Sequence, residues 1–142
     1  MAWRSFWPAF DRSRGGRPTA PRQTVLVVQR EEAVRWLIRG ILESDGHAVV
    51  EAGDALEALA TIRSLGRPVD LVLSDLIEPG LTGPGGLMGR LAPTTRVLLL
   101  SLFAGEEEIP QDSTHAMAVL QNPFRPDALG NKVRELLEER QK

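Results

Sequence analysis

The chain has 142 residues, of which 42% are hydrophobic and 25% charged, and its formal net charge is −2 at pH 7. This length suits one domain with its own core, and the composition is that of a globular protein rather than a disordered or membrane-spanning one. Cysteine is absent, which excludes disulfides and thiolate metal sites. The first eight residues lack the apolar core of a secretory signal. We therefore expect a cytoplasmic protein.

Residues 1–22 differ in charge from the rest of the chain. They hold five arginines and one aspartate, so they carry +4 and the remainder carries −6. Four aromatic residues recur there at helical spacing: Trp3, Phe6, Trp7 and Phe10. Such a pattern suits a membrane surface or an apolar groove, but Pro8 interrupts it and residues 14–21 have the composition of a flexible linker. We predict a basic, aromatic-containing tail, disordered or docked on its own domain rather than on a membrane, followed by one domain over residues 23–142.

The first half of that domain alternates between strand and helix patterns. Residues 25–28 form a short apolar run typical of a buried strand, and apolar residues then recur on one helical face over residues 34–42. Residues 48–50 predict a second strand. Asp54 is the expected N-cap of a second helix, which Gly66 ends.

The second half predicts three further strands, at residues 69–74, 97–101 and 116–120. The helix between the first two is weakened around residues 87–91, because each nearby glycine costs about 1 kcal/mol relative to alanine. The helix between the last two is weakened as well, because Pro110 interrupts residues 105–115. A final helix begins at Pro126.

Five strands that alternate with helices predict an α/β fold with one doubly wound parallel sheet. The expected strand order is 2-1-3-4-5, the simplest choice at this size. Asp75 follows the third strand and therefore lies at the carboxyl edge of the sheet, where ligands bind in such folds. Pro79 and Gly80 then turn the chain. We expect the functional site at this edge.

Several segments, taken in order, resemble the receiver domain of two-component response regulators. They are Val25 to Val28 ahead of Glu31 to Arg35, Glu51 to Leu59, Asp70 to Leu76 with Pro79-Gly80, Leu100-Ser101, and Asn122-Pro123-Phe124. The resemblance covers residues 24–140 and implies a flavodoxin-like, CheY-like fold that acts in phosphorelay signal transduction. It implies that Asp75 is the phosphoacceptor and that the Ser101 hydroxyl follows the phosphate. It also implies loop roles for Ile77 and Pro79 and a cis peptide bond before Pro123.

Two features of that family are missing from the sequence. Receivers hold Mg²⁺ with two acidic residues after the first strand, but here these positions are Gln29 and Arg30, and the family's lysine is replaced by Asn122. Mg²⁺ prefers carboxylate and carbonyl oxygens, which leaves Asp75 and the backbone of Ile77. We expect no cofactor and at most weak Mg²⁺ binding. Because phosphoryl transfer depends on cations, the resemblance implies weak or no phosphorylation.

The hypothesis for Arg30 is that it stands in for the metal and pairs with Asp75, which would favour the ionised carboxylate. The alternative is a solvated residue at a helix start. The alternative to a phosphate-following role for Ser101 is a buried hydroxyl whose hydrogen bonds are satisfied. The alternative for Asn122 is a turn residue. Trp36 lies beside the apolar helical stripe, either as an interface anchor or partly buried against a neighbour.

Three classes of function remain open. The first is a receiver that signals through protein contacts, with no enzymatic activity beyond slow self-phosphorylation. The second is a pseudo-receiver that binds partners without phosphate. The third, a nucleotide- or flavin-binding enzyme, lacks a glycine-rich phosphate loop after the first strand. The expected partners are a histidine kinase or a downstream signalling protein, bound through residues 105–140. We expect no nucleic acid as a partner, and a homodimer is left open.

Overall fold

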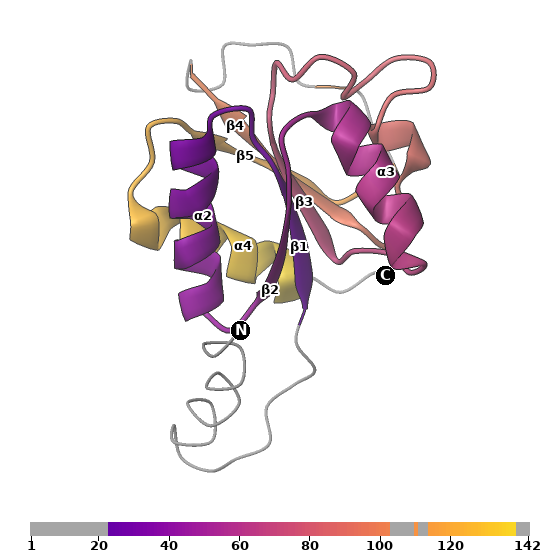
Figure 1. The fold of residues 1–142 in the computed structure, drawn as a ribbon. Helices are drawn as coiled ribbons and strands as arrows, with labels where there is room; N and C mark the ends of the chain where they lie inside the picture. Colours follow the sequence, from indigo (N-terminus) through magenta and orange to yellow (C-terminus); the bar gives the residue numbers. More distant parts are fainter. Residues whose placement is uncertain (1–22, 103–109, 111–113, 139–142) are drawn as a thin grey trace.

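The computed structural model describes residues 23–102, 110 and 114–138. Its strands form one parallel sheet in the order β2-β1-β3-β4-β5, which confirms the predicted topology (Figure 1). The strands are β1 (Thr24–Val28), β2 (Ala48–Ala52), β3 (Leu71–Asp75), β4 (Arg96–Ser101) and β5 (Met117–Gln121). Each begins and ends within two residues of its predicted bounds.

Helices cover both faces of this sheet. The helices α2 (Glu32–Ser44) and α4 (Pro126–Glu138) lie on one face, and α3 (Ala55–Leu65) lies on the other (Figure 1). The alternation of side chains along each strand produces the two cores. In β1, Val25 and Val27 pack with α2 and α4, whereas Leu26 and Val28 pack on the side of α3.

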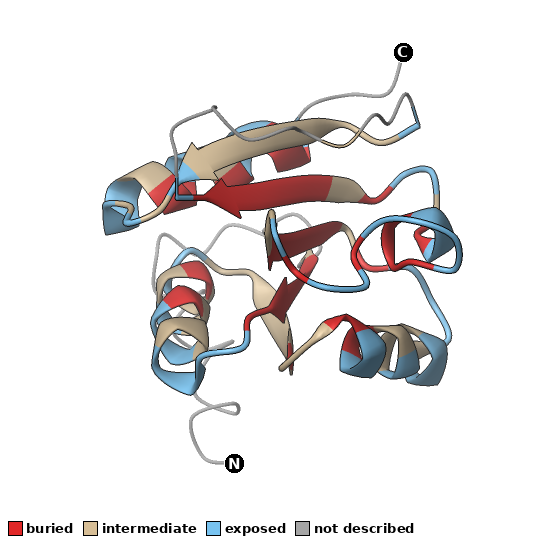
Figure 2. Ribbon diagram, turned by 90° about the horizontal axis from the view of Figure 1, so that it is seen from above, coloured by how far each residue is buried: buried red, intermediate tan, exposed pale blue. Residues whose placement is uncertain are grey.

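Among the strands, the three central ones carry nearly all of the buried residues (Figure 2). All five residues of β1 are buried, as are the first four of β3 and the last five of β4. The edge strands β2 and β5 are mostly half-buried. A strand covered on both faces has no solvent side for polar residues, which explains the uninterrupted apolar runs in the sequence.

The predicted boundaries of α3 are confirmed. The Asp54 carboxylate accepts a hydrogen bond from the backbone N–H of Glu57 at 2.8 Å, which satisfies one of the donors that a helix start leaves unpaired. At the other end Gly66 adopts φ 70°, a left-handed conformation that glycine takes without steric cost.

The weakened third helix is reduced to a single 3₁₀ turn, η1 (Met88–Arg90). In front of it the chain forms a compact loop whose buried Leu81 and Leu87 pack against the sheet. Gly86 sits so close to the preceding turn that an added Cβ would lie 2.5 Å from the carbonyl oxygen of Thr82. The glycines that allow this close approach disfavour a regular helix.

Two predictions fall largely outside the described residues. The first is the tail, residues 1–22, and the second is the weakened fourth helix within residues 105–115, of which 110, 114 and 115 are described. Within the described part of the chain, no helix has the length and hydropathy that a bilayer crossing requires.

Candidate functional site

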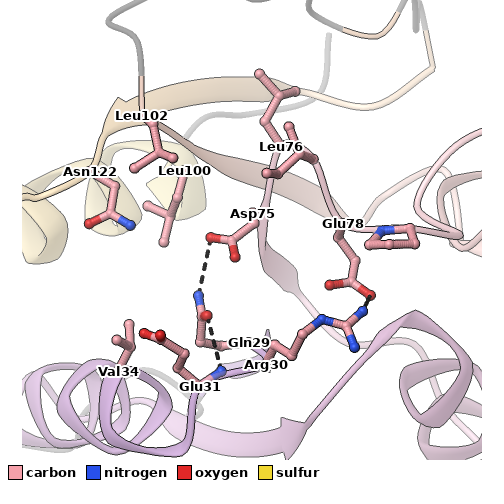
Figure 3. Close-up of a pocket in the computed structure, with 12 residues that line it drawn as sticks. Gln29, Arg30, Glu31, Val34, Asp75, Leu76, Glu78, Leu100, Leu102 and Asn122 are labelled. Carbon is pink, nitrogen blue, oxygen red and sulfur yellow. Dashed lines mark hydrogen bonds and ion pairs between the residues drawn. The ribbon is translucent and has the colours of Figure 1, made fainter.

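A cavity of about 570 Å³ opens at the carboxyl edge of the sheet, where β1, β3, β4 and β5 end (Figure 3). Its walls are largely apolar, formed by side chains such as Val34, Leu76 and Leu100. Polar and charged side chains converge on it from three strand ends: Gln29, Arg30, Glu31, Asp75, Glu78 and Asn122. The predicted location of the site therefore coincides with a real cavity.

Asp75 is the last residue of β3 and is half-buried in this cavity. One of its carboxylate oxygens, Oδ1, accepts a hydrogen bond from the side-chain Nε2 of Gln29 at 3.1 Å. Gln29 is buried, and its side-chain oxygen Oε1 accepts the backbone N–H of Glu31 at 3.4 Å. With both ends of its amide engaged, Gln29 holds the Asp75 side chain in one orientation.

The pKa of Asp75 is raised above its ordinary value. Burial is the main cause, because it disfavours the charged form. The hydrogen bond from Gln29 lowers the pKa, the negative charge of Glu31 raises it, and the positive charge of Arg30 lowers it. The surroundings of Asp75 therefore stabilise its charged form less well than water does.

The predicted ion pair between Arg30 and Asp75 is wrong. The guanidinium Nη2 of Arg30 lies 3.3 Å from Oε2 of Glu78 instead (Figure 3). Its side chain is 59% exposed, whereas that of Glu78 is 2% exposed. A buried carboxylate attracts a cation more strongly than a half-exposed one that already has an amide partner, because water screens it less.

Glu78 is a site residue that sequence reasoning missed. The same Oε2 that meets Arg30 also accepts the backbone N–H of Ala55, the first residue of α3, at 3.0 Å. It therefore joins the loop after β3 to the start of α3 and to the segment between β1 and α2. An acidic residue ahead of Pro79-Gly80 is typical of an exposed loop, so the sequence gives no signal of this burial. Glu31, which lines the cavity, was also not predicted as a site residue.

The oxygen ligands that Mg²⁺ requires are poorly provided by this arrangement. Gln29 turns an N–H group rather than an oxygen toward Asp75, and Arg30 brings a fixed positive charge into the same cavity. Among the described residues, no group of three or more histidines and acids is placed to hold a metal ion. The donor set as arranged does not fit Mg²⁺.

The other predicted residues divide into two groups. Asn122 lines the cavity, its N–H donates to the carbonyl oxygen of Ser101 at 2.7 Å, and its bond to Pro123 is the one cis peptide bond in the described chain. Ile77 and Pro79 also line the cavity. Ser101 is buried, but the cavity is lined by its neighbours Leu100 and Leu102 rather than by Ser101 itself.

Large hydrophobic side chains are exposed around the same edge of the sheet. Trp36 is 71% exposed, so of its two alternatives partial burial is wrong. Helices that follow parallel strands begin at the carboxyl edge, and the exposed residues lie either in the first two turns of such helices or in loops after β3 and β4. They are Trp36, Leu37, Leu56, Ile77 and Leu102. We call these five residues the apolar rim.

Known proteins related in sequence are two-component signalling proteins. The sensor kinase CckA of Brucella abortus is 34% identical over 120 residues, which are 81% of this chain and 12% of CckA. The sensor histidine kinase AruS of Pseudomonas aeruginosa is 33% identical over 121 residues, 79% of this chain and 12% of AruS. The DNA-binding response regulator MtrA of Mycobacterium tuberculosis is 39% identical over 62 residues, 44% of this chain and 26% of MtrA. The chain thus spans only a small part of these proteins, and no family model matches it.

Solved structures give the same relationship over most of the fold. The receiver domain of the hybrid histidine kinase CckA aligns with a TM-score of 0.64 at 29% identity and covers 81% of this chain and 99% of that domain. The chemotaxis protein CheY4 of Vibrio cholerae aligns with a TM-score of 0.65 at 25% identity and covers 82% of this chain and 99% of CheY4. Together with the 2-1-3-4-5 sheet, these similarities show that the chain has the fold of the receiver domains of two-component response regulators and is related to them in sequence.

Proposed function

We propose that the chain is a phosphorelay receiver in which Asp75 accepts a phosphoryl group slowly and the signal leaves through protein contacts. The observation that carries this proposal is the position of Asp75. It ends β3 in an open cavity, and within the described residues its side chain accepts one hydrogen bond, from Gln29. One carboxylate oxygen thus remains available to an incoming phosphorus atom.

Slow transfer is expected because the resting cavity neutralises little negative charge. Phosphoryl transfer is accelerated mainly by positive charge and hydrogen-bond donors placed around the phosphoryl oxygens. Asn122 offers a neutral amide, and Arg30 is engaged by Glu78. Burial raises the pKa of Asp75, and the hydrogen bond from Gln29 and the charge of Arg30 do not outweigh it.

The apolar rim favours a protein partner at the mouth of the cavity. Exposed aromatic and aliphatic side chains are enriched at interaction surfaces, and two members of the rim, Ile77 and Leu102, line the cavity itself. The partner surface expected from the sequence, residues 105–140, includes residues 105–109, 111–113 and 139–140, which lie outside the described chain. In the described part of that range, no large hydrophobic side chain is exposed. We propose that a histidine-kinase-like partner contacts the rim.

A pseudo-receiver is the second candidate, and the Arg30–Glu78 pair favours it. In this ion pair Glu78 balances the positive charge of Arg30 without any phosphate. In that case Asp75 would serve only as a polar residue held by Gln29, and partners would recognise the apolar rim in a single state.

Intact-mass spectrometry after incubation with acetyl phosphate separates the two candidates. We expect the wild-type protein to gain the mass of one phosphoryl group and Asp75→Asn to gain none. Asp127→Asn, which removes an exposed carboxylate on α4, is the matched control and should be modified like the wild type. A wild-type protein that remains unmodified under conditions that phosphorylate another receiver would contradict the proposal and leave the pseudo-receiver.

A further inference from the structure

We propose that Arg30 is the cation that neutralises the phosphoryl group on Asp75, and that Glu78 holds Arg30 away from Asp75 until that group arrives. This inference rests on the proposed function, because it concerns the phosphorylated state of the same cavity. The chain lacks both the lysine and the acidic pair that would hold a metal ion. The proposal therefore assigns neutralisation of the phosphoryl charge to one arginine.

Arg30 is the one cationic side chain among the described residues that line the cavity. It follows directly after Gln29, the residue that holds Asp75, and its positive charge already lowers the pKa of Asp75 against the stronger effect of burial. The guanidinium therefore lies close enough to act on Asp75 electrostatically without being paired with it.

The two partners in the resting ion pair differ in burial. Glu78 is almost fully buried and is fixed by the N–H of Ala55. More than half of the Arg30 side chain lies in solvent, and one bond of 3.3 Å from Nη2 joins it to Glu78. An exposed arginine on a flexible stem can change partner without repacking of its surroundings, whereas a buried carboxylate cannot. If the pair separates, Arg30 is the side chain that moves.

Phosphorylation supplies the free energy for that movement. Transfer from acetyl phosphate forms a bond between an Asp75 carboxylate oxygen and phosphorus, while the bond from phosphorus to the acetate oxygen breaks and its electron pair leaves with acetate. The new acyl phosphate carries up to about two negative charges and three acceptor oxygens. A planar guanidinium binds such a group through two parallel hydrogen bonds, against the single bond that Glu78 receives from Arg30.

The exchange would reach α3 through Glu78. After Arg30 leaves, Glu78 still accepts the N–H of Ala55, but its buried negative charge has lost its cation. The first turn of α3, with the exposed Leu56 of the apolar rim, is therefore the element that senses phosphorylation. The same carboxylate thus restrains Arg30 and links the cavity to a surface.

Two substitutions should change the phosphorylation rate in opposite directions. Arg30→Gln removes the cation, and we expect the rate with acetyl phosphate to fall at least about tenfold, as for other transition-state donors. Glu78→Gln releases Arg30 while its amide oxygen can still accept the N–H of Ala55, and we expect the rate to rise about threefold or more. The double variant should match Arg30→Gln alone. Arg63→Gln, on an exposed part of α3, is the control and should behave like the wild type.

The rates are measured by intact mass, once with excess EDTA and once with Mg²⁺, after circular dichroism has shown that each variant is folded. If Arg30→Gln does not fold, Arg30→Lys replaces it. We then expect an intermediate rate, because lysine keeps the positive charge but lacks the planar guanidinium that donates two parallel hydrogen bonds. Rates in EDTA and Mg²⁺ should agree within about twofold, since the charge comes from the protein.

Three results would overturn the inference. If both single variants slow the reaction equally, the pair is only structural; if Arg30→Gln has no effect, or if Mg²⁺ accelerates the wild type more than about tenfold, the neutralising charge lies elsewhere. In each of these cases an Asp75-dependent adduct still supports the proposed function. A wild-type protein that takes up no phosphoryl group would overturn both.

Discussion

Two groups of arginine–glutamate contacts lie near α2, and they are built differently. Along the helix, Arg35 and Arg39 both contact Glu51 on β2, and Arg39 also contacts Glu43 at 2.9 Å. All four of these side chains are partly exposed. Before the helix, Arg30 meets the buried Glu78 alone. The first group shares its charges among several partners near water, whereas the second leaves one buried carboxylate dependent on one exposed cation.

The pKa values of two carboxylates, Glu51 in the first group and Asp75 beside the second, are shifted in opposite directions. Burial acts to raise the pKa of Glu51, but the hydrogen bonds from Arg39 and Arg35 outweigh it and the pKa is lowered. Burial also raises the pKa of Asp75, and there the hydrogen bond from Gln29 and the charge of Arg30 do not outweigh it. An arginine network favours the ionised form of Glu51, while the candidate site leaves Asp75 less stable when charged. The first arrangement suits a stable edge of the sheet, and the second suits a reactive group.

The largest effect on stability is expected from Arg30→Ala. It leaves Glu78 buried without a cation, and we expect the free energy of unfolding at pH 7 to fall by about 2 kcal/mol, less than the 3–5 kcal/mol of a fully buried pair because Arg30 is mostly solvated. Urea denaturation measures this loss. In a Glu78→Gln background the same substitution should cost less than about 0.5 kcal/mol. Equal losses in the two backgrounds would show that Arg30 does not stabilise the protein through Glu78.

Glu51→Gln tests the network and should have a smaller effect. Two arginines lose their shared carboxylate, and we expect a loss of about 1 kcal/mol at pH 7 after allowance for screening by solvent. Because the pKa of Glu51 is lowered in the folded protein, its contribution is present above its ordinary pKa and is lost as the pH falls through the folded value. Denaturation at pH 7 and at pH 3 checks this. A loss that persists at the lower pH would contradict an electrostatic origin.

Asp75→Asn should act in the opposite direction. The raised pKa of Asp75 means that the folded protein binds its proton more tightly than the unfolded chain does, so ionisation lowers stability as the pH rises through the folded value. The variant should therefore be more stable than the wild type at pH 7, by less than about 1 kcal/mol because water screens this half-exposed group. The difference should disappear below the ordinary pKa of the carboxyl group. Destabilisation at pH 7 would show that Gln29 compensates the charge fully.

The smallest effect is expected for an ion pair that belongs neither to the Glu51 network nor to the Arg30–Glu78 pair. Arg125 lies 3.2 Å from Asp127 at the start of α4, and both side chains are largely exposed. Pairs of this kind contribute little, because solvent screens them and ordering two long side chains opposes the attraction. The thermal midpoint of Arg125→Gln should match that of the wild type in calorimetry. A clear decrease would mean that exposure alone does not separate the weak pairs from the strong ones in this protein.

Local sequence predicted the fold well because the relevant signals are local. Buried strands produce short apolar runs, and Asp54 and Gly66 mark the ends of α3 by their own backbone chemistry. The replacement of the third helix by η1 followed from its glycines. The predicted cluster of Gln29, Asp75 and Asn122 around one cavity followed from their positions after parallel strands.

The sequence predictions failed where a residue had a choice of partners. For Arg30 the sequence left a contact with Asp75 or a solvated position, and for Trp36 an interface anchor or partial burial. Neighbouring residues do not decide either choice. Ser101 illustrates the same difficulty, because a residue at the end of a buried strand can face either side of the sheet. Glu78 gave no signal at all, since burial of a loop carboxylate depends on what packs over it.

Taken alone, the sequence determined the parallel sheet and the placement of Asp75 at its carboxyl edge, because apolar runs and turn residues act over a few neighbouring positions. The tertiary structure decided that Arg30 binds Glu78, a residue 48 positions away, and that Gln29 holds Asp75. The physical reason is that burial sets the strength of each charge, and burial is known only after the loops from separate strands have come together.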